Sequence, residues 1–415
     1  MDLKKRLKDI AEFLKPYQKI WENEIMLMYP DPLADYPPEW IEDLIRFKDT
    51  EDQIRLERRD FKGLIQNPSL LNFYERIEEL CQIDHSPQLP DFPETPFSFL
   101  YVIPKKQHEI KNLAPIINDF YVKNHISSVV DIGGGFGLLA QSLVNHYPLK
   151  VISLDMDQEL QATGKNRHEK NAKDKSNKVN YQLIKIDEGN KEFQNLLRPQ
   201  MMSVGLHTCG PLAIHQIKAS QESGIKGILN FGCCYHKLAK GRNWQNISRF
   251  AQSLASPIEQ NVYSLTLASR AHRKMNKKDY DFKLRVKLYR YAIHFLLIDE
   301  YGQDKLISLG NTAEKIYNES FAVYAQEQFQ RIKLHCHHSP EELNSYFANE
   351  KRIKLIHDML AAGLIRNALG RLLEIYLLLD RAIYLEEQGY EAKLMECFDE
   401  SISPRNIGVL AQLKS

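Results

Sequence analysis

The chain has 415 residues, of which 43% are hydrophobic and 26% charged, and its formal net charge is +1. This length allows two or three domains with a sizeable core, and the even charge balance excludes a global attraction to nucleic acid or membranes. The sequence has no apolar run near the ~18 residues of a membrane span, and six cysteines are too few for a disulfide framework in a chain of this length. We therefore expect a cytoplasmic protein that does not bind membranes.

Residues 1–100 predict an N-terminal helical region. Apolar residues recur at helical spacing from Leu3 to Leu14, until Pro16 interrupts the pattern. Proline-rich linkers at residues 29–38 and 87–96 punctuate this region.

From Pro104 the pattern changes to alternating strands and helices, which predicts an α/β fold with a parallel sheet. We expect this first part of a Rossmann-like domain to cover residues 101–238. Its strands are expected at residues 127–131, 151–155, 180–187, 201–206 and 225–231.

After the fifth strand, residues 239–360 predict a helical insertion. One apolar stripe there begins at Leu284, and Ser339 precedes Pro340 and Glu342 in the arrangement of a helix start. Residues 361–415 then predict a last helix over about 364–388, followed by short strands at 392–398 and 407–413. We infer a sheet that is interrupted after its fifth strand and completed at the end of the sequence.

Residues 129–137 read Val-Val-Asp-Ile-Gly-Gly-Gly-Phe-Gly and predict a ligand-binding turn. The glycines allow a tight turn that brings bare backbone against a ligand, at the start of an expected helix. The dinucleotide fingerprint G-x-G-x-x-G does not fit, because position 138 is Leu. An acid two residues before the first glycine instead resembles motif I of class I S-adenosylmethionine (SAM) methyltransferases. That resemblance implies SAM binding by Asp131, Gly133, Gly135 and Gly137.

Acidic residues also end the next two expected strands. Asp155, at the tip of the second strand, can accept hydrogen bonds from both ribose hydroxyls of a nucleoside, and Asp157 is the competing candidate. The third strand ends at Asp187, which the resemblance places near the adenine. The alternative for each acid is a helix cap or a solvated loop.

A cluster of histidines and cysteines follows the fourth and fifth strands. His207 and Cys209 come after one strand, and Cys234, Tyr235 and His236 come after the other. Ligands of open α/β sheets bind outside the carboxyl ends of the strands, so we expect the methyl acceptor here.

Three interpretations of this cluster compete. In the first, a histidine positions or deprotonates the acceptor and Tyr235 stacks or hydrogen-bonds, with a cysteine nucleophile as a variant. In the second, the cluster binds zinc, although side chains of neighbouring residues such as Cys233 and Cys234 should diverge on a strand. In the third, the cysteines are small buried hydrophobes. We predict the acceptor pocket and assign no metal.

Several segments resemble the methyltransferase-like 25 family, whose domain is described as a class I SAM methyltransferase domain. They include residues 105–110, His-Thr-Cys-Gly at 207–210, Cys-Cys-Tyr-His at 233–236 and Ser-Pro-Arg-Asn at 403–406. The family implies SAM as cofactor and RNA as a candidate acceptor. On a helix that leads into the first strand, Lys106 and His108 can lie near the SAM carboxylate or a substrate phosphate; the alternative is an ordinary solvated basic turn. The two His/Cys motifs are also similar to those of acceptor-stem tRNA ribose methyltransferases, which have a second His in place of Tyr235.

The segment from Arg270 to Arg290 contains nine Lys and Arg and only two Asp. Such a face can neutralise several phosphates, although charge runs are often ordinary solvated helix surface. The basic residues that could contact phosphates are Arg270, Arg273, Lys274, Lys277, Lys278, Lys283, Lys287 and Arg290.

We therefore predict a SAM-dependent methyltransferase that acts on RNA. The alternatives are methylation of a small molecule or a protein, and a non-catalytic protein that keeps SAM and binds RNA or another partner. The Asp/Asn-Pro-Pro-Tyr signature of many amino-methylating enzymes is missing, and His207-Thr208-Cys209-Gly210 stands at its position.

Overall fold

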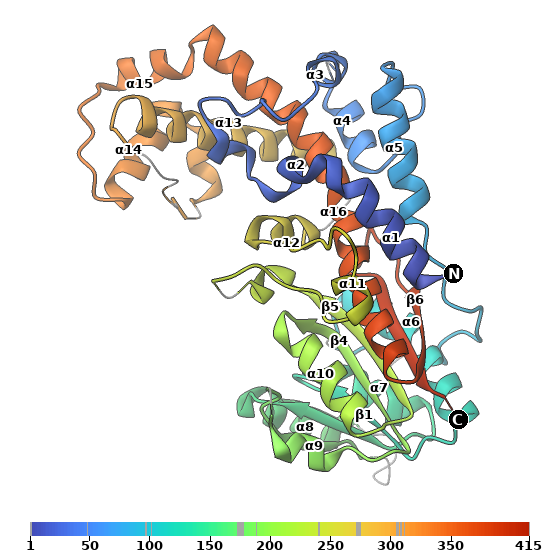
Figure 1. Ribbon diagram of the computed structural model, residues 1–415. Coiled ribbons are helices and arrows are strands. Elements are labelled where there is room, and N and C mark those ends of the chain that lie inside the picture. The colour runs from blue at the N-terminus through green and yellow to red at the C-terminus, as the bar shows by residue number, and fades with distance from the viewer. Residues whose placement is uncertain are drawn as a thin grey trace. The chain divides into compact units, whose positions relative to one another are not determined.

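The computed structural model describes residues 2–47, 49–95, 98–100, 102–171, 178–187, 189–239, 241–270, 275–303, 307, 309–310 and 312–414. The chain divides into two compact units. The first, here named the sheet unit, comprises residues 1–16, 80–273 and 371–415. The second, the helical unit, comprises residues 17–79 and 274–370. Both units are therefore assembled from separate stretches of the sequence (Figure 1).

The sheet unit is built on one seven-stranded sheet with the order β3-β2-β1-β4-β5-β7-β6. Strands β1 to β5 run parallel, whereas β7 pairs antiparallel with both β5 and β6. The strands are β1 Ser128–Ile132, β2 Val151–Asp155, β3 Asn180–Leu183, β4 Met201–Cys209, β5 Gly227–Cys233, β6 Tyr390–Glu396 and β7 Ile407–Leu413. This arrangement confirms the predicted class I methyltransferase sheet that is interrupted after its fifth strand.

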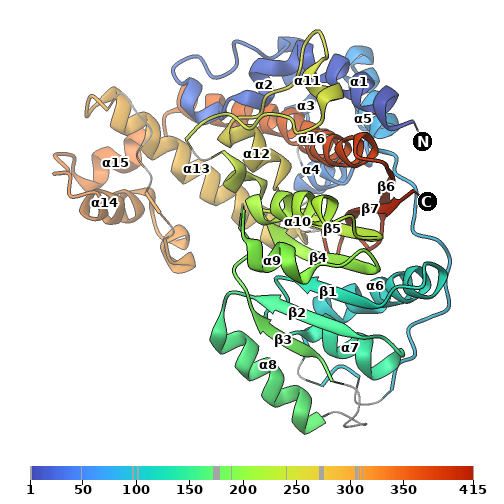
Figure 2. The same cartoon turned by 60° about the horizontal axis from the view of Figure 1, so that its bottom comes forward.

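Helices cover both faces of this sheet. α6 (Pro104–Lys123) and α7 (Leu138–His146) lie together on one side, and α9 (Lys191–Leu196) and α10 (Pro211–Glu222) lie on the other (Figure 2). Buried side chains of α6 and α7 share one apolar core with β1, β4 and β5, for example Ile117, Leu143 and Met202. The remaining helices of the unit are α1 Leu3–Leu14, α8 Gln158–Asn171, η3 Tyr235–Leu238, α11 Arg249–Gln252, α12 Val262–Ala268 and the carboxyl-terminal part of α16.

The helical unit contains no strand in its described part. A capping box formed by Ser339 and Glu342 starts α15, as the sequence predicts. Its elements are α2 Gln18–Glu22, η2 Ile25–Met28, α3 Pro38–Leu44, α4 Thr50–Glu57, α5 Pro68–Cys81, α13 Lys277–Asp299, η4 Glu314–Asn318, α14 Phe321–Arg331, α15 Pro340–Phe347 and the first part of α16. Within the described residues, no helix combines the length and the apolar character that a membrane span needs.

Some predicted boundaries differ from the observed ones. β4 and β5 extend to Cys209 and Cys233, so the cysteine motifs lie on the strands and not only after them. β3 ends at Leu183, four residues before Asp187. The last helix, α16 (Glu350–Glu387), begins well before the predicted start near residue 364, because Gly363 lies inside the helix and does not interrupt it.

Candidate functional site

The glycine turn lies between the end of β1 and the start of α7. Gly133, Gly135 and Gly137 have φ angles of +66°, +57° and +69°, in the left-handed region that glycine adopts without strain. A Cβ atom at Gly137 would lie 2.7 Å from the ring of Tyr181, so a side chain is excluded there for steric reasons as well. The turn therefore requires glycine and presents bare backbone at the amino-terminal end of α7.

The structure distinguishes between the two acids at the end of β2. Asp155 Oδ2 accepts a hydrogen bond from the backbone N–H of Gly135 at 2.8 Å, which joins the strand end to the glycine turn. Asp157 Oδ1 accepts from the backbone N–H groups of Glu159 and Leu160, both at 3.0 Å, and so caps α8. Asp155 is therefore the acid that lies at the turn, whereas Asp157 has a structural role.

Asp131 and Ser153 place two buried polar atoms beside the glycine turn. Within the described part of the chain, Asp131 Oδ2 and Ser153 Oγ have no hydrogen-bond partner, and Asp131 is only 3% exposed. A Cβ atom at Gly134 would lie 2.3 Å from Ser153 Oγ and 2.7 Å from Asp131 Oδ2. Since buried polar groups are nearly always paired, two unpaired ones at this turn are typical of a site that binds a polar ligand.

Burial raises the pKa of Asp131 to about 7, and the charge of Asp155 adds to this effect, whereas the charge of Lys106 opposes it. The carboxyl group is therefore close to half-protonated at neutral pH in the ligand-free protein.

Asp187 lies in the loop after β3. Its carboxylate pairs with Lys185 Nζ at 2.9 Å on an exposed surface, and this hydrogen bond lowers the pKa of Asp187. Its placement near an adenine ring stays a prediction.

Glu109 of α6 is fully buried and forms a polar centre that sequence analysis did not identify. His207 Nε2 lies 2.6 Å from Glu109 Oε1, Ser403 Oγ donates to the same oxygen at 2.6 Å, and Lys106 Nζ lies 2.9 Å from Oε2. Burial alone would raise the pKa of Glu109. The pKa is nevertheless held well below its usual range by the hydrogen bond and charge of His207, the charge of Lys106 and the hydrogen bond from Ser403. Glu109 is therefore ionised at neutral pH.

This carboxylate determines which ring nitrogen of His207 donates a hydrogen bond. An ionised carboxylate can only accept hydrogen bonds, so Nε2 of His207 carries a proton and donates to Glu109. In the neutral ring Nδ1 then has a free lone pair that can accept a proton. His207 adopts φ +64° at the point where the register of β4 against β5 shifts, between Gly205 and Thr208. The irregular strand end thus sets the direction of the imidazole.

Lys106 and His108, the two predicted cofactor contacts on α6, both have partners within the chain. Lys106 pairs with Glu109, and His108 Nε2 accepts from the backbone N–H of Asp399 at 3.0 Å. Their predicted role toward SAM stays a prediction.

The three cysteines at the ends of β4 and β5 converge. Cys209 Sγ lies 3.0 Å from Cys233 Sγ and 3.6 Å from Cys234 Sγ. The prediction that Cys233 and Cys234 point apart is wrong, because Cys234 adopts φ +49° and no longer follows the alternation of a strand. The hydrogen bond with Cys233 lowers the pKa of Cys209 to about 5, against the effect of burial.

Tyr235 and His236 follow in η3 and differ from each other in exposure. Tyr235 is fully buried, and its hydroxyl lies 3.1 Å from the carbonyl oxygen of Gly232 and 3.2 Å from the Glu374 carboxylate. This is an interior position, which does not suit the acceptor-stacking role that the sequence suggested. His236 is partly exposed.

The predicted basic segment lies mainly on α13. Lys283 Nζ forms an ion pair with Glu57 at 2.8 Å, Lys277 pairs with Asp49, and Arg290 donates to the carbonyl oxygen of Gly310 at 2.8 Å. Lys278 and Arg285 are exposed. Arg273 and Lys274 lie outside the described residues. Several members are thus engaged within the helical unit, and binding of RNA by this face stays a prediction.

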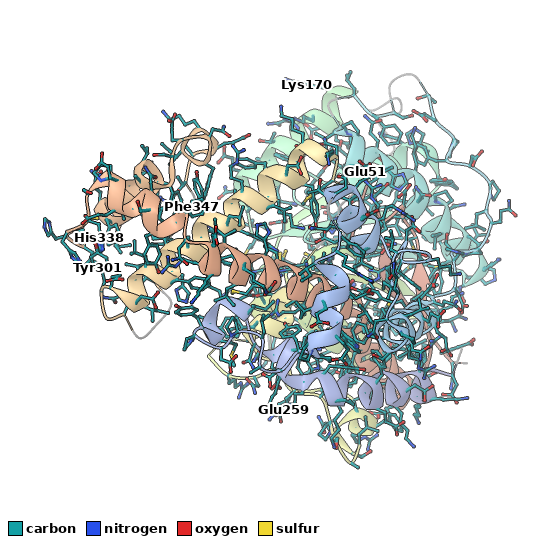
Figure 3. All side chains as sticks on the ribbon, turned by 90° about the horizontal axis from the view of Figure 1, so that it is seen from above. Glu51, Lys170, Glu259, Tyr301, His338 and Phe347 are labelled. Atoms are coloured by element: carbon teal, nitrogen blue, oxygen red, sulfur yellow. The ribbon has the colours of Figure 1, made fainter. Side chains whose placement is uncertain are left out.

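His335, Cys336, His337 and His338 lie in the loop before α15. Tyr301 lies beside His338 (Figure 3), and its hydroxyl is 2.8 Å from His338 Nδ1.

The sheet order and the glycine turn are those of the class I methyltransferase fold. A family model described as a methyltransferase domain matches residues 105–241, which contain β1 to β5 and the turn. The chain is similar to "Probable methyltransferase-like protein 25" of Homo sapiens, with 24% identity over 294 residues that cover 66% of this chain and 48% of the human protein. The protein of the same description from Mus musculus is 26% identical over 228 residues, which cover 51% of this chain and 37% of the mouse protein.

The chain thus spans about half the length of the human relative that it matches. The predicted resemblance to the methyltransferase-like 25 family is confirmed.

We expect Asp131→Asn to remove a pH dependence from the stability of the ligand-free protein. Because the folded pKa is raised, the native state binds more protons than the unfolded chain between about pH 4 and pH 7, so stability falls as pH rises through this range. The difference in the free energy of unfolding between the variant and the wild type should therefore be about 1–4 kcal/mol more favourable to the variant above pH 7 than at acidic pH. Urea unfolding at several pH values measures this difference.

The matched control is Asp157→Asn, which keeps a helix-capping side chain. Its stability profile should parallel that of the wild type. Parallel profiles of the wild type and Asp131→Asn would contradict the raised pKa.

Proposed function

We propose that this chain is a SAM-dependent methyltransferase that acts on RNA. The observation that carries the proposal is the glycine turn at residues 133–137 together with Asp155, whose carboxylate lies at the turn on the neighbouring strand. Backbone N–H groups at the start of α7 and a carboxylate on the next strand suit a nucleoside with a charged substituent.

The residues beside the turn fit SAM. Asp155 has carboxylate oxygens that can accept from ribose hydroxyls, and Asp131 Oδ2 and Ser153 Oγ are buried polar atoms without partners in the described chain. When bound, SAM supplies an electrophilic methyl group. The chain itself holds the cofactor, excludes water around the buried end of β1 and positions the acceptor.

His207 is the proton acceptor that the geometry favours. Methyl transfer to a hydroxyl or amine requires a free lone pair on the acceptor atom, and the proton must leave to a base. With Nε2 bound to Glu109, His207 can receive this proton at Nδ1, and the ionised carboxylate then stabilises the imidazolium. Glu109 thus acts as a positioning residue for His207.

Two observations support RNA as the acceptor. The family resemblance implies RNA as a candidate acceptor. In addition, α13 has a basic segment whose exposed members include Lys278 and Arg285. Basic groups at such positions strengthen RNA binding in a salt-dependent way.

Asp155→Ala should weaken SAM binding by ~1.5–3 kcal/mol, because charge-assisted hydrogen bonds to the ribose are lost. Isothermal titration calorimetry with the full chain measures this affinity. Asp157→Asn serves as the control and should bind SAM like the wild type, since Asp157 caps α8. Equal affinities of the wild type and Asp155→Ala would remove Asp155 from the site.

His207→Ala should reduce turnover by ~100-fold or more with little change in SAM affinity, because the lost interaction belongs to the transition state. Added imidazole should restore part of the activity, which a purely structural role would not allow. The comparison variant is His236→Ala, which lacks the Glu109 contact and should retain most activity. Full activity of His207→Ala would end the assignment of His207 as proton acceptor.

The acceptor class is tested by incubating the protein with labelled SAM and cellular RNA, protein and metabolite fractions. We expect the label in RNA. Lys278→Glu with Arg285→Glu should lower RNA affinity and flatten its dependence on salt, while SAM affinity is unchanged. The control is Lys62→Glu with Lys351→Glu, which makes the same charge change at exposed positions outside α13. Label only in protein or metabolites, or an unchanged salt slope, contradicts RNA as the acceptor bound by this segment.

A further inference from the structure

The ends of β4 and β5 bring three thiol groups into one cluster. Cys209 and Cys233 are direct partners in the parallel register of the two strands. Cys234, the next residue, turns its side chain toward the same place. All three sulfur atoms lie within 4.8 Å of one another, and within the described residues this is the one such group of potential metal ligands.

Three residues around the cluster have left-handed backbone conformations. His207, Gly210 and Cys234 all have positive φ angles, of +64°, +53° and +49°. For His207 and Cys234 this conformation is uncommon and costs free energy, so the surrounding structure must hold it. At Cys234 this conformation brings the third thiol to the other two, as three ligands for one ion require.

The distances suit a tetrahedral thiolate site. With Zn–S bonds of ~2.3 Å, two thiolates on one zinc ion lie about 3.8 Å apart. The Cys209–Cys234 distance of 3.6 Å is close to this value, and the Cys209–Cys233 distance of 3.0 Å requires only a small separation of the side chains. Cys233 is 8% exposed and the other two cysteines are partly exposed, so solvent can reach the open side of the cluster.

We propose that Cys209, Cys233 and Cys234 bind one zinc ion through three thiolates at the carboxyl ends of β4 and β5. On binding, the three thiols release their protons to solvent. Since the described residues supply three ligands, the fourth coordination position is left for water or for an atom of a substrate, as in catalytic rather than structural zinc sites. This inference rests on the cysteine geometry and does not depend on the proposed methyl transfer.

The test measures metal content and not activity. The full chain is reduced, incubated with zinc, desalted and analysed by mass spectrometry of the metal. We expect about one zinc per chain. Cys209→Ser and Cys234→Ser should each lose most of the metal, whereas Cys336→Ser, which alters a cysteine in the loop before α15, should keep it.

Two measurements on the wild type keep the proposal falsifiable if a variant does not fold. Cobalt in place of zinc should give thiolate-to-metal charge-transfer bands and the strong visible bands of a tetrahedral site. Zinc should also slow alkylation of Cys209, Cys233 and Cys234, as located by peptide mass spectrometry, and leave that of Cys336 unchanged. A reduced protein that takes up neither metal, or whose three cysteines are alkylated equally fast with and without zinc, overturns the site.

Discussion

The buried carboxylate of Glu109 is the interaction on which the arrangement of the candidate acceptor site depends. It joins α6 to His207, 98 residues away, and to Ser403, 294 residues away. Removing one partner of a buried charge costs about 3–5 kcal/mol, because the remaining charge is left uncompensated. The helix before the sheet, an inner strand and the loop between β6 and β7 are therefore coupled through one side chain. The same contact sets which nitrogen of the imidazole at the end of β4 donates to the carboxylate.

The local features of the fold were predictable because each has a local cause. Buried parallel strands are short apolar runs, and the glycine turn is required by three backbone conformations that other residues adopt poorly. The completion of the sheet by residues 407–413 could also be inferred, since β7 lies where the sequence placed it. The start of α16 was missed because Gly363, directly before the predicted start, is an interior residue of the helix and not a boundary.

The features of the site that were missed arise from long-range geometry. Glu109 looks like an ordinary helical acid in the sequence, and only folding brings His207 and Ser403 to it. The choice between Asp155 and Asp157 depends on which carboxylate reaches the backbone N–H of Gly135. The two acids are only two residues apart, so the sequence alone does not distinguish them. The cysteines converge because Cys234 has a positive φ angle. The sequence does not predict this conformation at a residue other than glycine.

The position of β7 between β5 and β6 also has a consequence for synthesis on the ribosome. After β5 emerges, its free edge must wait for a partner strand until residues 234–406 have been translated. At ~5–20 residues per second this delay is roughly 10–35 s, far longer than the time in which a small domain folds. During that interval the remaining residues of the helical unit are translated. The incomplete sheet meanwhile exposes an unpaired apolar strand to other nascent chains. The order of the strands thus leaves the edge of β5 unpaired until β7, near the end of the sequence, has been translated.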